Sequence, residues 1–389
     1  MPHPQFDAIV IGAGSVGNPT AYFLAREGLC VLVLDELASS GQGQNKAAIG
    51  GVRATHSDPA KIRLCQLSLD VFSRWRESTG TDIGWKAGGY CFPAFDATVE
   101  ATLLQLLPIQ KQYRLNIDWL GAEGIQRVVP GIREEGLRGG TYSPDDGQVN
   151  PLRASASFTS EALRLHAEYR YRESVEGLVM EDHTVTGVRT DRGEYYAPVV
   201  INAAGVHASR ICQMVGLDLP ILPDSHEGGI SAPVKPFLGP LVVDLRPGPE
   251  GKTTNFYFGQ DADDQIIFCY TPKVPIAGEN RTSTYEFMPV VAARLVEVLP
   301  RLKNLTIRRV WRGLYPMTPD GSPIVGKAPR VEGLLLGIGM CGQGFMLGPG
   351  VAMNLASLAV HGKPVTDPEV FDLLSPSRDL FGSRRESLK

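Results

Sequence analysis

Three glycines near the N-terminus, Gly12, Gly14 and Gly17, have the spacing G-x-G-x-x-G, and Asp35 ends the next apolar run. An apolar run precedes the glycines and a helical pattern follows them, so they lie at a strand-to-helix turn. The first glycine allows the tight bend, the second lets backbone approach a pyrophosphate, and the third lets the helix pack on the strand. A carboxylate placed like Asp35 can bind ribose hydroxyls. These residues predict a dinucleotide site, for NAD or FAD.

A second glycine-rich junction between strand and helix lies near the C-terminus, in LLLGIGMCGQGFMLGPGVAMNLASLAV at 334–360. We expect the stretch 340–350 to be a loop and the helix to begin at residue 351. A helix N-terminus has unpaired N–H groups and positive potential, which would stabilise negative charge on the N1–C2=O edge of a reduced flavin. An NAD enzyme needs no such second junction. The sequence therefore favours FAD over NAD.

The two junctions lie near opposite ends of the chain, so the fold must bring distant segments together. Alternating strand and helix patterns occur at the start, middle and end, with strand-rich sequence between them. This order predicts an α/β, two-domain fold, with a Rossmann-type FAD-binding domain built from discontinuous segments and a β-sheet-rich second domain. The first domain comprises 1–84, 145–222 and 308–375, the second comprises 85–144 and 223–307, and 376–389 form a C-terminal tail that we expect to be disordered.

Charge and cysteine content exclude several classes of protein. The chain of 389 residues has a formal net charge of −4 with basic and acidic residues interspersed, so we expect no nucleic-acid partner. Six scattered cysteines, without a C-x-x-C pair, predict neither a disulfide framework nor a metal site. The N-terminus lacks a signal-peptide pattern, and no apolar run is long enough for a membrane span. We therefore expect a cytoplasmic protein with no membrane span.

Five segments together resemble the FAD-dependent amine and amino-acid oxidoreductases, the family of sarcosine oxidase, glycine oxidase and D-amino acid oxidase. They are the motif at 12–17, GGVR at 50–53, INAAG at 201–205, WRGLYPMTPDGSPIVG at 311–326 and GMCGQGFMLGPG at 339–350. The chain is most similar to the β subunits of heteromeric sarcosine oxidase and dye-linked L-proline dehydrogenase. The resemblance implies a flavin between an FAD domain and a β-sheet substrate domain. It also implies oxidation of an amine or amino acid (sarcosine, proline, glycine or a relative) by hydride transfer to flavin N5, giving an imine that hydrolyses.

The resemblance also implies which residues contact FAD. Because the covalent flavin cysteine of monomeric sarcosine oxidase aligns near Gly313, we expect FAD to be bound without a covalent bond. The contacts lie in the N-terminal motif, at the end of the second strand, around GGVR, in the AAG turn, at Gly313 and in the C-terminal glycine-rich segment. They are Gly12, Ala13, Gly14, Ser15, Val16, Gly17, Asp35, Glu36, Gln44, Asn45, Ala47, Ala48, Gly51, Val52, Arg53, Ala203, Ala204, Gly205, Gly313, Cys341, Gly342, Gln343, Gly344, Phe345 and Met346.

Six side chains are candidates for contact with the substrate or the flavin ring. The resemblance places Arg53 against that ring. The family's carboxylate-binding residues are missing, because Tyr315 stands where glycine oxidase has an arginine. His56 and Met346 stand where monomeric sarcosine oxidase has an arginine and a lysine. Arginine, histidine and tyrosine can still bind a carboxylate. The candidates are Arg53, His56, His226, Tyr257, Tyr270 and Tyr315.

Other residues leave the details of the chemistry open. Arg312 is a further candidate for binding a carboxylate, and Glu227 could be a general base if burial raises its pKa. Tyr257 and Tyr270 lie on predicted strands whose alternate residues face the flavin, although packing in the core explains them equally well.

The electron acceptor and the reaction class also stay open. The lysine that activates oxygen in monomeric sarcosine oxidase aligns near Ile267, which favours a dehydrogenase that passes electrons to another acceptor or a partner subunit. One alternative is an FAD-dependent dehydrogenase of an alcohol such as glycerol phosphate. Another is a non-catalytic subunit that holds a flavin within a heteromeric complex.

Overall fold

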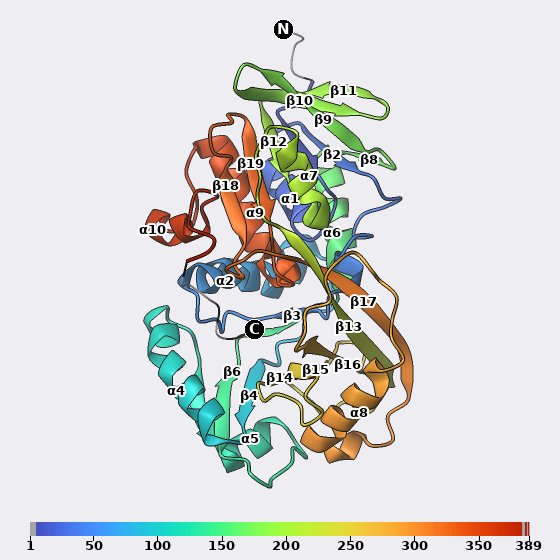
Figure 1. Cartoon of the computed structure of the whole chain (residues 1–389), viewed down its shortest axis with the longest axis vertical. Coiled ribbons are helices and arrows are strands. Elements are labelled where there is room, and N and C mark those ends of the chain that lie inside the picture. Colours follow the sequence, from blue (N-terminus) through green and yellow to red (C-terminus); the bar gives the residue numbers. More distant parts are fainter. Residues whose placement is uncertain (1–4, 383–385, 387, 389) are drawn as a thin grey trace.

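A mostly parallel sheet, the first sheet, forms the centre of the upper half of the molecule (Figure 1). The computed structural model describes residues 5–382, 386 and 388. The central strand β1 pairs in parallel with β2 and β12, whereas the edge strand β18 runs antiparallel to β19. The spatial order is β18 (Ile324–Lys327), β19 (Leu334–Ile338), β12 (Val199–Asn202), β1 (Ala8–Ile11), β2 (Val31–Asp35) and β8 (Glu168–Tyr171).

Helices cover one face of the first sheet and a small antiparallel sheet covers the other. Ala8 and Val10 pack in an apolar cluster with α1, α2, α6 and α9, whereas Ile9 and Ile11 pack with α7 and the sheet β11-β10-β9. This division follows because successive side chains of a strand point to opposite faces. The helices of this half, on either face, are α1 (Gly17–Arg26), α2 (Pro59–Ser73), α3 (Trp75–Thr79), α6 (Pro151–Arg164), α7 (Ala208–Gln213), α9 (Gly344–His361) and α10 (Pro368–Phe371). The small sheet holds β9 (Val175–Glu181), β10 (Thr184–Thr190) and β11 (Gly193–Tyr196).

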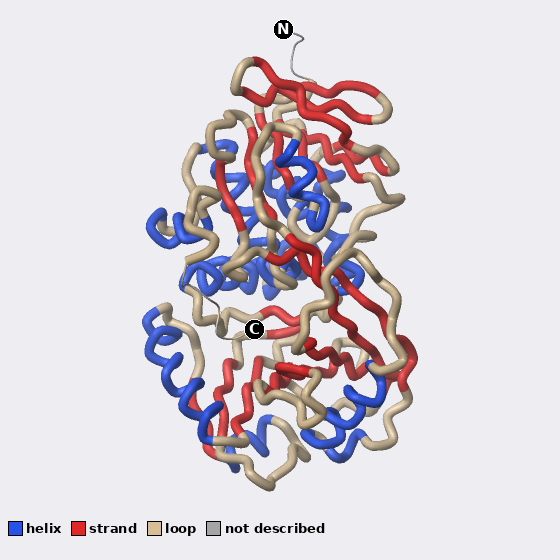
Figure 2. The backbone as a smooth tube through the Cα atoms, in the orientation of Figure 1, coloured by secondary structure: helices blue, strands red, loops and turns tan. Residues whose placement is uncertain are grey.

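A second sheet organises the lower half of the molecule, and Figure 2 shows helices flanking it. On this sheet Cys91 and Phe256 face a core shared with α5 and α8, whereas Tyr90 and Tyr257 belong to the opposite face. The spatial order is β17 (Ile307–Met317), β13 (Leu222–Pro233), β16 (Gln265–Pro272), β15 (Thr253–Gln260), β14 (Leu241–Asp244), β4 (Tyr90–Ala94), β6 (Gly139–Ser143) and β5 (Asp118–Gly121). The flanking helices are α4 (Ala97–Gln112), α5 (Ala122–Val128) and α8 (Phe287–Val298). Strand β3 (Gly51–Val52) pairs separately with β7 (Gly147–Gln148).

The α/β fold class predicted from the sequence is confirmed. The first sheet draws its strands from the start, middle and end of the chain, as the order of strand and helix patterns indicates. Strands β10 and β11 form an antiparallel hairpin in the small sheet. Strand β17 pairs with β13 in the second sheet, although the predicted segment 308–375 groups it with the first domain.

Helix α9 begins earlier than the sequence predicts. It starts at Gly344, not at residue 351. The glycines that indicate a loop instead allow close packing, because a Cβ on Gly348 would lie 2.0 Å from the backbone oxygen of Ser15. A Cβ on Gly350 would similarly strike the backbone of α2. These glycines therefore lie within a helix and let its backbone approach the backbone of neighbouring segments closely.

The predicted disorder of the tail does not hold for its described end. Glu386 and Leu388 are 8% and 1% exposed, so both are buried. Residues 383–385, 387 and 389 lie outside the described residues, and the prediction for them stays untested.

Candidate active site

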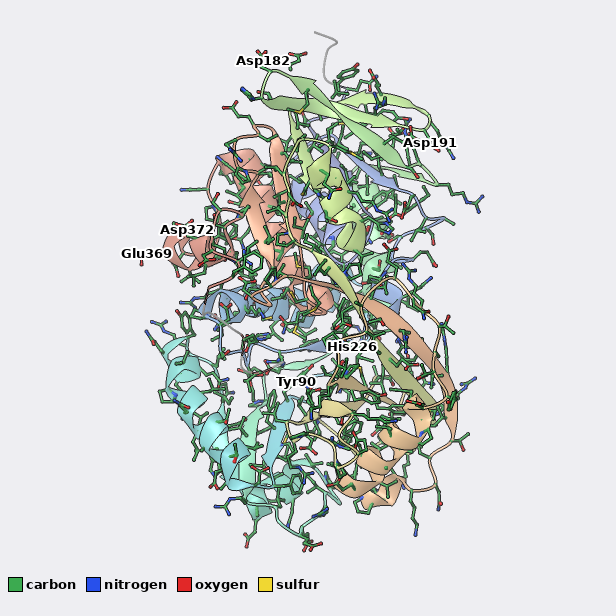
Figure 3. All side chains as sticks on the ribbon, in the orientation of Figure 1. Tyr90, Asp182, Asp191, His226, Glu369 and Asp372 are labelled. Carbon is green, nitrogen blue, oxygen red and sulfur yellow. The ribbon has the colours of Figure 1, made fainter. Side chains whose placement is uncertain are left out.

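A cavity of about 550 Å³ lies between the two sheets. Its wall includes the N-terminal glycine-rich loop and strand ends of the first sheet, together with residues of β13, β15 and β17 from the second. Figure 3 shows two lining residues, Tyr90 and His226, in the middle of the molecule where the upper and lower halves meet. Its volume falls in the range of about 300–1,000 Å³ that ligand and cofactor sites occupy.

The N-terminal glycine-rich loop forms one end of the cavity. A Cβ on Gly12 would lie 2.5 Å from the Ala203 backbone oxygen, and a Cβ on Gly17 would lie 1.8 Å from that of Gly12. Both glycines are therefore required for packing between β1, α1 and the turn after β12. A Cβ on Gly14 would meet no described atom within 4 Å, because Gly14 faces the cavity. This open space suits the pyrophosphate that the motif predicts.

Asp35 lies in the same end of the cavity and fixes the loop. Its Oδ2 accepts a hydrogen bond from the Ala13 N–H at 2.7 Å, and its Oδ1 accepts one from the Leu37 N–H at 2.8 Å. Burial raises the pKa of Asp35, against the lowering effect of these bonds. Each carboxylate oxygen has a further lone pair for a ribose hydroxyl. Beside it, Glu36 lies 2.9 Å from Nδ1 of His207.

The N-terminus of α9 forms another part of the wall. Gln343, which precedes the helix, and Met346 in its first turn both line the cavity. First-turn amides have no acceptor within their own helix, so they are available as donors to a ligand. The side-chain oxygen of Gln343 is buried and has no hydrogen-bond partner among the described residues. Cys341, just before the helix, has a left-handed φ of 50°. The segment thus holds unsatisfied polar groups in a strained turn beside the cavity.

Tyrosine and histidine side chains line the second-sheet side. The hydroxyls of Tyr257 and Tyr315 lie 3.4 Å apart, and the rings of Tyr315 and His226 have centroids 3.8 Å apart. Asp224 Oδ2 lies 3.5 Å from Nε2 of His226. Burial raises the pKa of both tyrosines well above the usual value. Both phenols are therefore neutral donors at physiological pH.

The register between β15 and β16 turns Tyr257 and Tyr270, both predicted site residues, to opposite faces of the second sheet. Tyr257 pairs with Cys269, whereas Tyr270 pairs with Phe256 and so shares the face turned to α8. The Tyr270 ring packs on Phe287, with centroids 5.2 Å apart. The structure therefore places Tyr270 outside the cavity lining. It packs in the core, which was the alternative left open by the sequence.

The same alternation removes Glu227 and Arg312 from the cavity wall. Arg312 Nη2 donates to Glu227 Oε2 at 3.0 Å. The N–H and hydroxyl of Thr284 also donate to the Glu227 carboxylate, at 2.6 and 2.7 Å. With its oxygens held in this network, Glu227 is not placed to act as a general base.

Arg53 lines the cavity and is held by backbone acceptors. Its Nη1 donates to the Thr55 carbonyl, and its Nη2 donates to the Leu388 carbonyl at 2.5 Å. The guanidinium carbon lies 5.5 Å from the centre of the Phe92 ring. These contacts fix a buried positive charge at the edge of the cavity.

His56 does not line the cavity. It is fully buried, its Nε2 lies 3.5 Å from Sγ of Cys65, and its Nδ1 lies 3.4 Å from Glu386 Oε2. Burial, together with the charge of Arg53, lowers the pKa of His56 to about 4. His56 is therefore neutral at physiological pH and lies outside the cavity lining, in contrast to the expectation that it contacts the substrate.

Most residues that the sequence predicts for the cofactor line this one cavity. Ala13, Gly17 and Val52 do not, because Gly17 packs on Gly12 and the other two are buried in the core. Contact with FAD stays a prediction for the whole set. The lining members are Gly12, Gly14, Ser15, Val16, Asp35, Glu36, Gln44, Asn45, Ala47, Ala48, Gly51, Arg53, Ala203, Ala204, Gly205, Gly313, Cys341, Gly342, Gln343, Gly344, Phe345 and Met346.

The cavity lining also includes residues that are absent from the sequence-based set, among them Tyr90, Asp224 and Asn255. Asn255 lies two residues before Tyr257 on β15 and so shares its face, a signal that period-2 alternation could have given. Asp224 likewise lies two residues before His226. Tyr90 gives no comparable signal, because it sits in an apolar run.

Asp146 is a further residue that sequence reasoning missed. It is 1% exposed, and its Oδ1 accepts from the Ala54 N–H at 2.8 Å. This bond positions the backbone next to Arg53. Burial raises the pKa of Asp146 to about 7, against the lowering effects of the Ala54 bond and the Arg53 charge.

We predict that Asp146→Asn becomes more stabilising, relative to wild type, as pH rises from 5 to 8. A carboxyl whose pKa is higher in the folded protein contributes stability at low pH and loses it as pH rises through about 7. The difference in free energy of unfolding between variant and wild type should grow by roughly 2 kcal/mol over this range. Urea unfolding at both pH values measures it, with exposed Asp145→Asn as control. An Asp146→Asn difference independent of pH would contradict the argument.

No helix among the described residues is long and apolar enough to cross a membrane. In the same part of the chain, no three His, Cys, Asp or Glu side chains gather as a metal ion would require.

Comparison with known proteins gives a consistent family. The sequence model described as FAD dependent oxidoreductase matches residues 7–358. Glycine oxidase of Pseudomonas aeruginosa is 28% identical, over 92% of this chain and 96% of its own. The solved structure of L-proline dehydrogenase from P. horikoshii is 28% identical, with a TM-score of 0.88, over 96% of this chain and 97% of that one.

Several matched relatives are much longer than this chain. Mitochondrial sarcosine dehydrogenase of Mus musculus is 26% identical over 94% of this chain but only 41% of its own length. The chain spans 41% to 45% of the curated sarcosine dehydrogenases, dimethylglycine dehydrogenases and 4-methylaminobutanoate oxidase that it matches.

Proposed function

We propose that this chain, which belongs to the family of FAD-dependent oxidoreductases, oxidises the C–N bond of a small amine or amino acid such as sarcosine, proline or glycine. One observation carries the proposal: a dinucleotide cradle and a wall of tyrosine and histidine side chains meet in a single cavity. The named activities of the relatives, on sarcosine, glycine and proline, support the same substrate class.

FAD is the cofactor of this family, and the cavity residues fit it. The open space at Gly14 and the carboxylate of Asp35 suit its nucleotide half, and the first turn of α9 suits the electron-rich edge of its ring. When bound, FAD supplies the acceptor for two electrons and a hydride. We infer that it binds without a covalent link, because Gly313 offers no side chain for attachment where it lines the cavity.

The second-sheet wall would bind and orient the substrate. Tyr257 and Tyr315 are neutral donors, and two such hydroxyls 3.4 Å apart can both donate to one carboxylate. Arg53 adds a fixed positive charge at the edge of the cavity. The apolar side chains of Leu241 and Val243 line the same region and exclude water from it. These groups hold the substrate in place, and none of them needs to be a strong base.

We further propose that electrons leave to an acceptor other than oxygen. Ile267, where a relative has an oxygen-activating lysine, is buried and apolar. A partner subunit could take the electrons. We also propose a cytoplasmic location, supported by the six cysteines, all of which are free thiols.

The test is reduction of bound flavin without oxygen. Purified protein is mixed anaerobically with sarcosine, proline, glycine and glycerol phosphate, and the visible absorbance band of oxidised flavin is followed. Bleaching by an amine supports the proposal, whereas bleaching by glycerol phosphate alone, or by no compound, contradicts it. Admitting air then measures the reoxidation rate, and return of the colour within seconds would contradict the dehydrogenase assignment.

A further inference from the structure

A second group of hydrogen-bond donors lies where the cavity meets β4. Arg53 and Tyr90 both line the cavity, and they are only 6% and 3% exposed. The Tyr90 side chain extends from the second sheet to β3, because a Cβ on Gly51 would lie 1.8 Å from the Tyr90 hydroxyl oxygen. Gly51 leaves the space that this hydroxyl fills, two residues before Arg53 in the chain. Tyr90 therefore reaches the segment that carries Arg53.

Contacts with Phe92 place the Arg53 guanidinium near the Tyr90 ring. The rings of Tyr90 and Phe92 have centroids 6.3 Å apart, and the guanidinium carbon lies 5.5 Å from the centre of the Phe92 ring. Burial raises the pKa of Tyr90, and the charge of Arg53 opposes that rise. The phenol is therefore a neutral donor at physiological pH, and its hydroxyl has no hydrogen-bond partner among the described residues.

Arg53 is a buried cation that forms no ion pair with any described residue. Its hydrogen bonds to two backbone carbonyls leave further guanidinium N–H groups for a ligand. Burial raises the pKa of Asp146 nearby to about 7, so that carboxyl is only partly ionised at neutral pH. Glu386, whose carboxylate also feels the charge of Arg53, is paired with Lys61 at 3.7 Å. A buried cation without a counter-ion is costly, so this part of the cavity suits an anionic ligand.

These donors are separate from the hydroxyls of Tyr257 and Tyr315. Tyr257 lies on β15, two strands from β4, and its hydroxyl meets that of Tyr315 on β17, which is further still from β4. Because neighbouring strands are about 4.8 Å apart, the main chains at Tyr90 and Tyr257 are about 10 Å or more apart. Leu241 and Val243 of β14 line the cavity between them. The substrate region therefore has donors at two ends and apolar side chains in the middle.

We propose that Arg53 and Tyr90 bind a second carboxylate of the substrate, so that the amine oxidised by this chain has an acidic group at each end. The hydroxyls of Tyr257 and Tyr315 hold the first carboxylate, and the carbon atoms between the two acidic groups lie against the apolar side chains of β14. Tyr90 then determines specificity for dicarboxylic amines over amines with one carboxylate. This substrate class rests on the proposed function, whereas the second carboxylate site itself does not.

The second carboxylate site is tested first by binding, without turnover. N-(carboxymethyl)glycine is a small amine with two carboxylates. Glutarate has the same length but no amine, and glutaramate replaces one carboxylate of glutarate by an amide of the same shape. Calorimetric titration of the FAD-loaded protein with glutarate and glutaramate is compared for wild type, Tyr90→Phe and Tyr142→Phe. The last is a control, because Tyr142 lies on β6, next to β4, and packs in the apolar core on the opposite face of the sheet.

We expect wild type to bind glutarate at least about tenfold more tightly than glutaramate, because a hydrogen bond to a charged group is stronger than one to a neutral group. Tyr90→Phe should weaken glutarate binding about tenfold or more and glutaramate binding less than about threefold, whereas Tyr142→Phe should change neither. The site is overturned if wild type binds the two compounds equally, if it does not bind glutarate, or if Tyr90→Phe affects both compounds equally.

The substrate class is tested by anaerobic reduction of the flavin. N-(carboxymethyl)glycine is compared with its monoamide and with sarcosine. We expect kcat/KM for the dicarboxylate to exceed that for the monoamide at least about tenfold, mainly through KM, and Tyr90→Phe to reduce this preference at least about threefold. If sarcosine or the monoamide reduces the flavin as efficiently as the dicarboxylate, the dicarboxylic substrate class is wrong and the proposed function stands. If no amine reduces the flavin, the proposed function fails, and the titrations still decide the second carboxylate site.

Discussion

Replacing Gly14 by alanine should weaken FAD binding while leaving the apoprotein folded. The added Cβ would meet no described protein atom within 4 Å, and Gly14 does not have a positive φ that alanine would strain. The methyl group would instead occupy the space through which backbone approaches the pyrophosphate. An intruding methyl in a packed contact costs about 1–3 kcal/mol, so FAD affinity should fall about 10- to 100-fold. Fluorescence titration of apoprotein with FAD measures the affinity, and thermal unfolding measures the fold.

Gly12→Ala is the matched variant two residues earlier, and it should fail in a different way. Its Cβ would lie 2.5 Å from the Ala203 oxygen and 3.0 Å from the Ala203 carbonyl carbon, and its φ is +104°. The atoms that this Cβ would meet belong to the backbone, which cannot move as a flexible side chain can. We therefore expect the free energy of unfolding to fall by about 4 kcal/mol or more, leaving little folded protein. If Gly14→Ala binds FAD as wild type does, or unfolds like Gly12→Ala, the cradle assigned to this loop is wrong.

The contrast between these glycines shows what the sequence could predict. The spacing of Gly12, Gly14 and Gly17 gives each residue a different role, and the packing around each agrees with that role. At the other junction the glycine content alone was ambiguous. The glycines that let α9 pack closely on Ser15 look, in the sequence, like the glycines of a loop. A glycine required by a neighbouring backbone and one required by a turn look the same until the neighbour is known.

The direction in which side chains of the second sheet point was harder to predict from the sequence. Tyr257 and Tyr270 lie on adjacent strands in equally good strand patterns. Only the register, which pairs Tyr270 with Phe256, turns one toward the cavity and the other toward α8. A shift of one residue would exchange them, and no local pattern fixes that register. His56 and Glu386 could not be paired from the sequence at all, because their contact joins residues from opposite ends of the chain.

The tyrosines that line the cavity allow the strongest test of the substrate wall. We expect Tyr315→Phe to lower kcat/KM for the amine that reduces the flavin about 10- to 100-fold, because a hydrogen bond to a charged group contributes about 1.5–3 kcal/mol. Phenylalanine keeps the ring that stacks on His226 and removes only the hydroxyl. Stopped-flow reduction of the flavin without oxygen measures the change. Tyr270→Phe removes the same atom two strands away in the sheet, outside the cavity, and should change kcat/KM less than twofold.

Combining Tyr315→Phe with Tyr257→Phe decides whether the two hydroxyls act on one substrate group. If both donate to the same carboxylate, the double variant should lose about 100- to 1,000-fold in kcat/KM, and the loss should differ from the product of the single losses, because the phenols lie 3.4 Å apart and interact. An amine that lacks a carboxylate should be oxidised equally by all of these variants. Equal losses for substrates with and without a carboxylate would show that the hydroxyl pair shapes the cavity and does not bind that group.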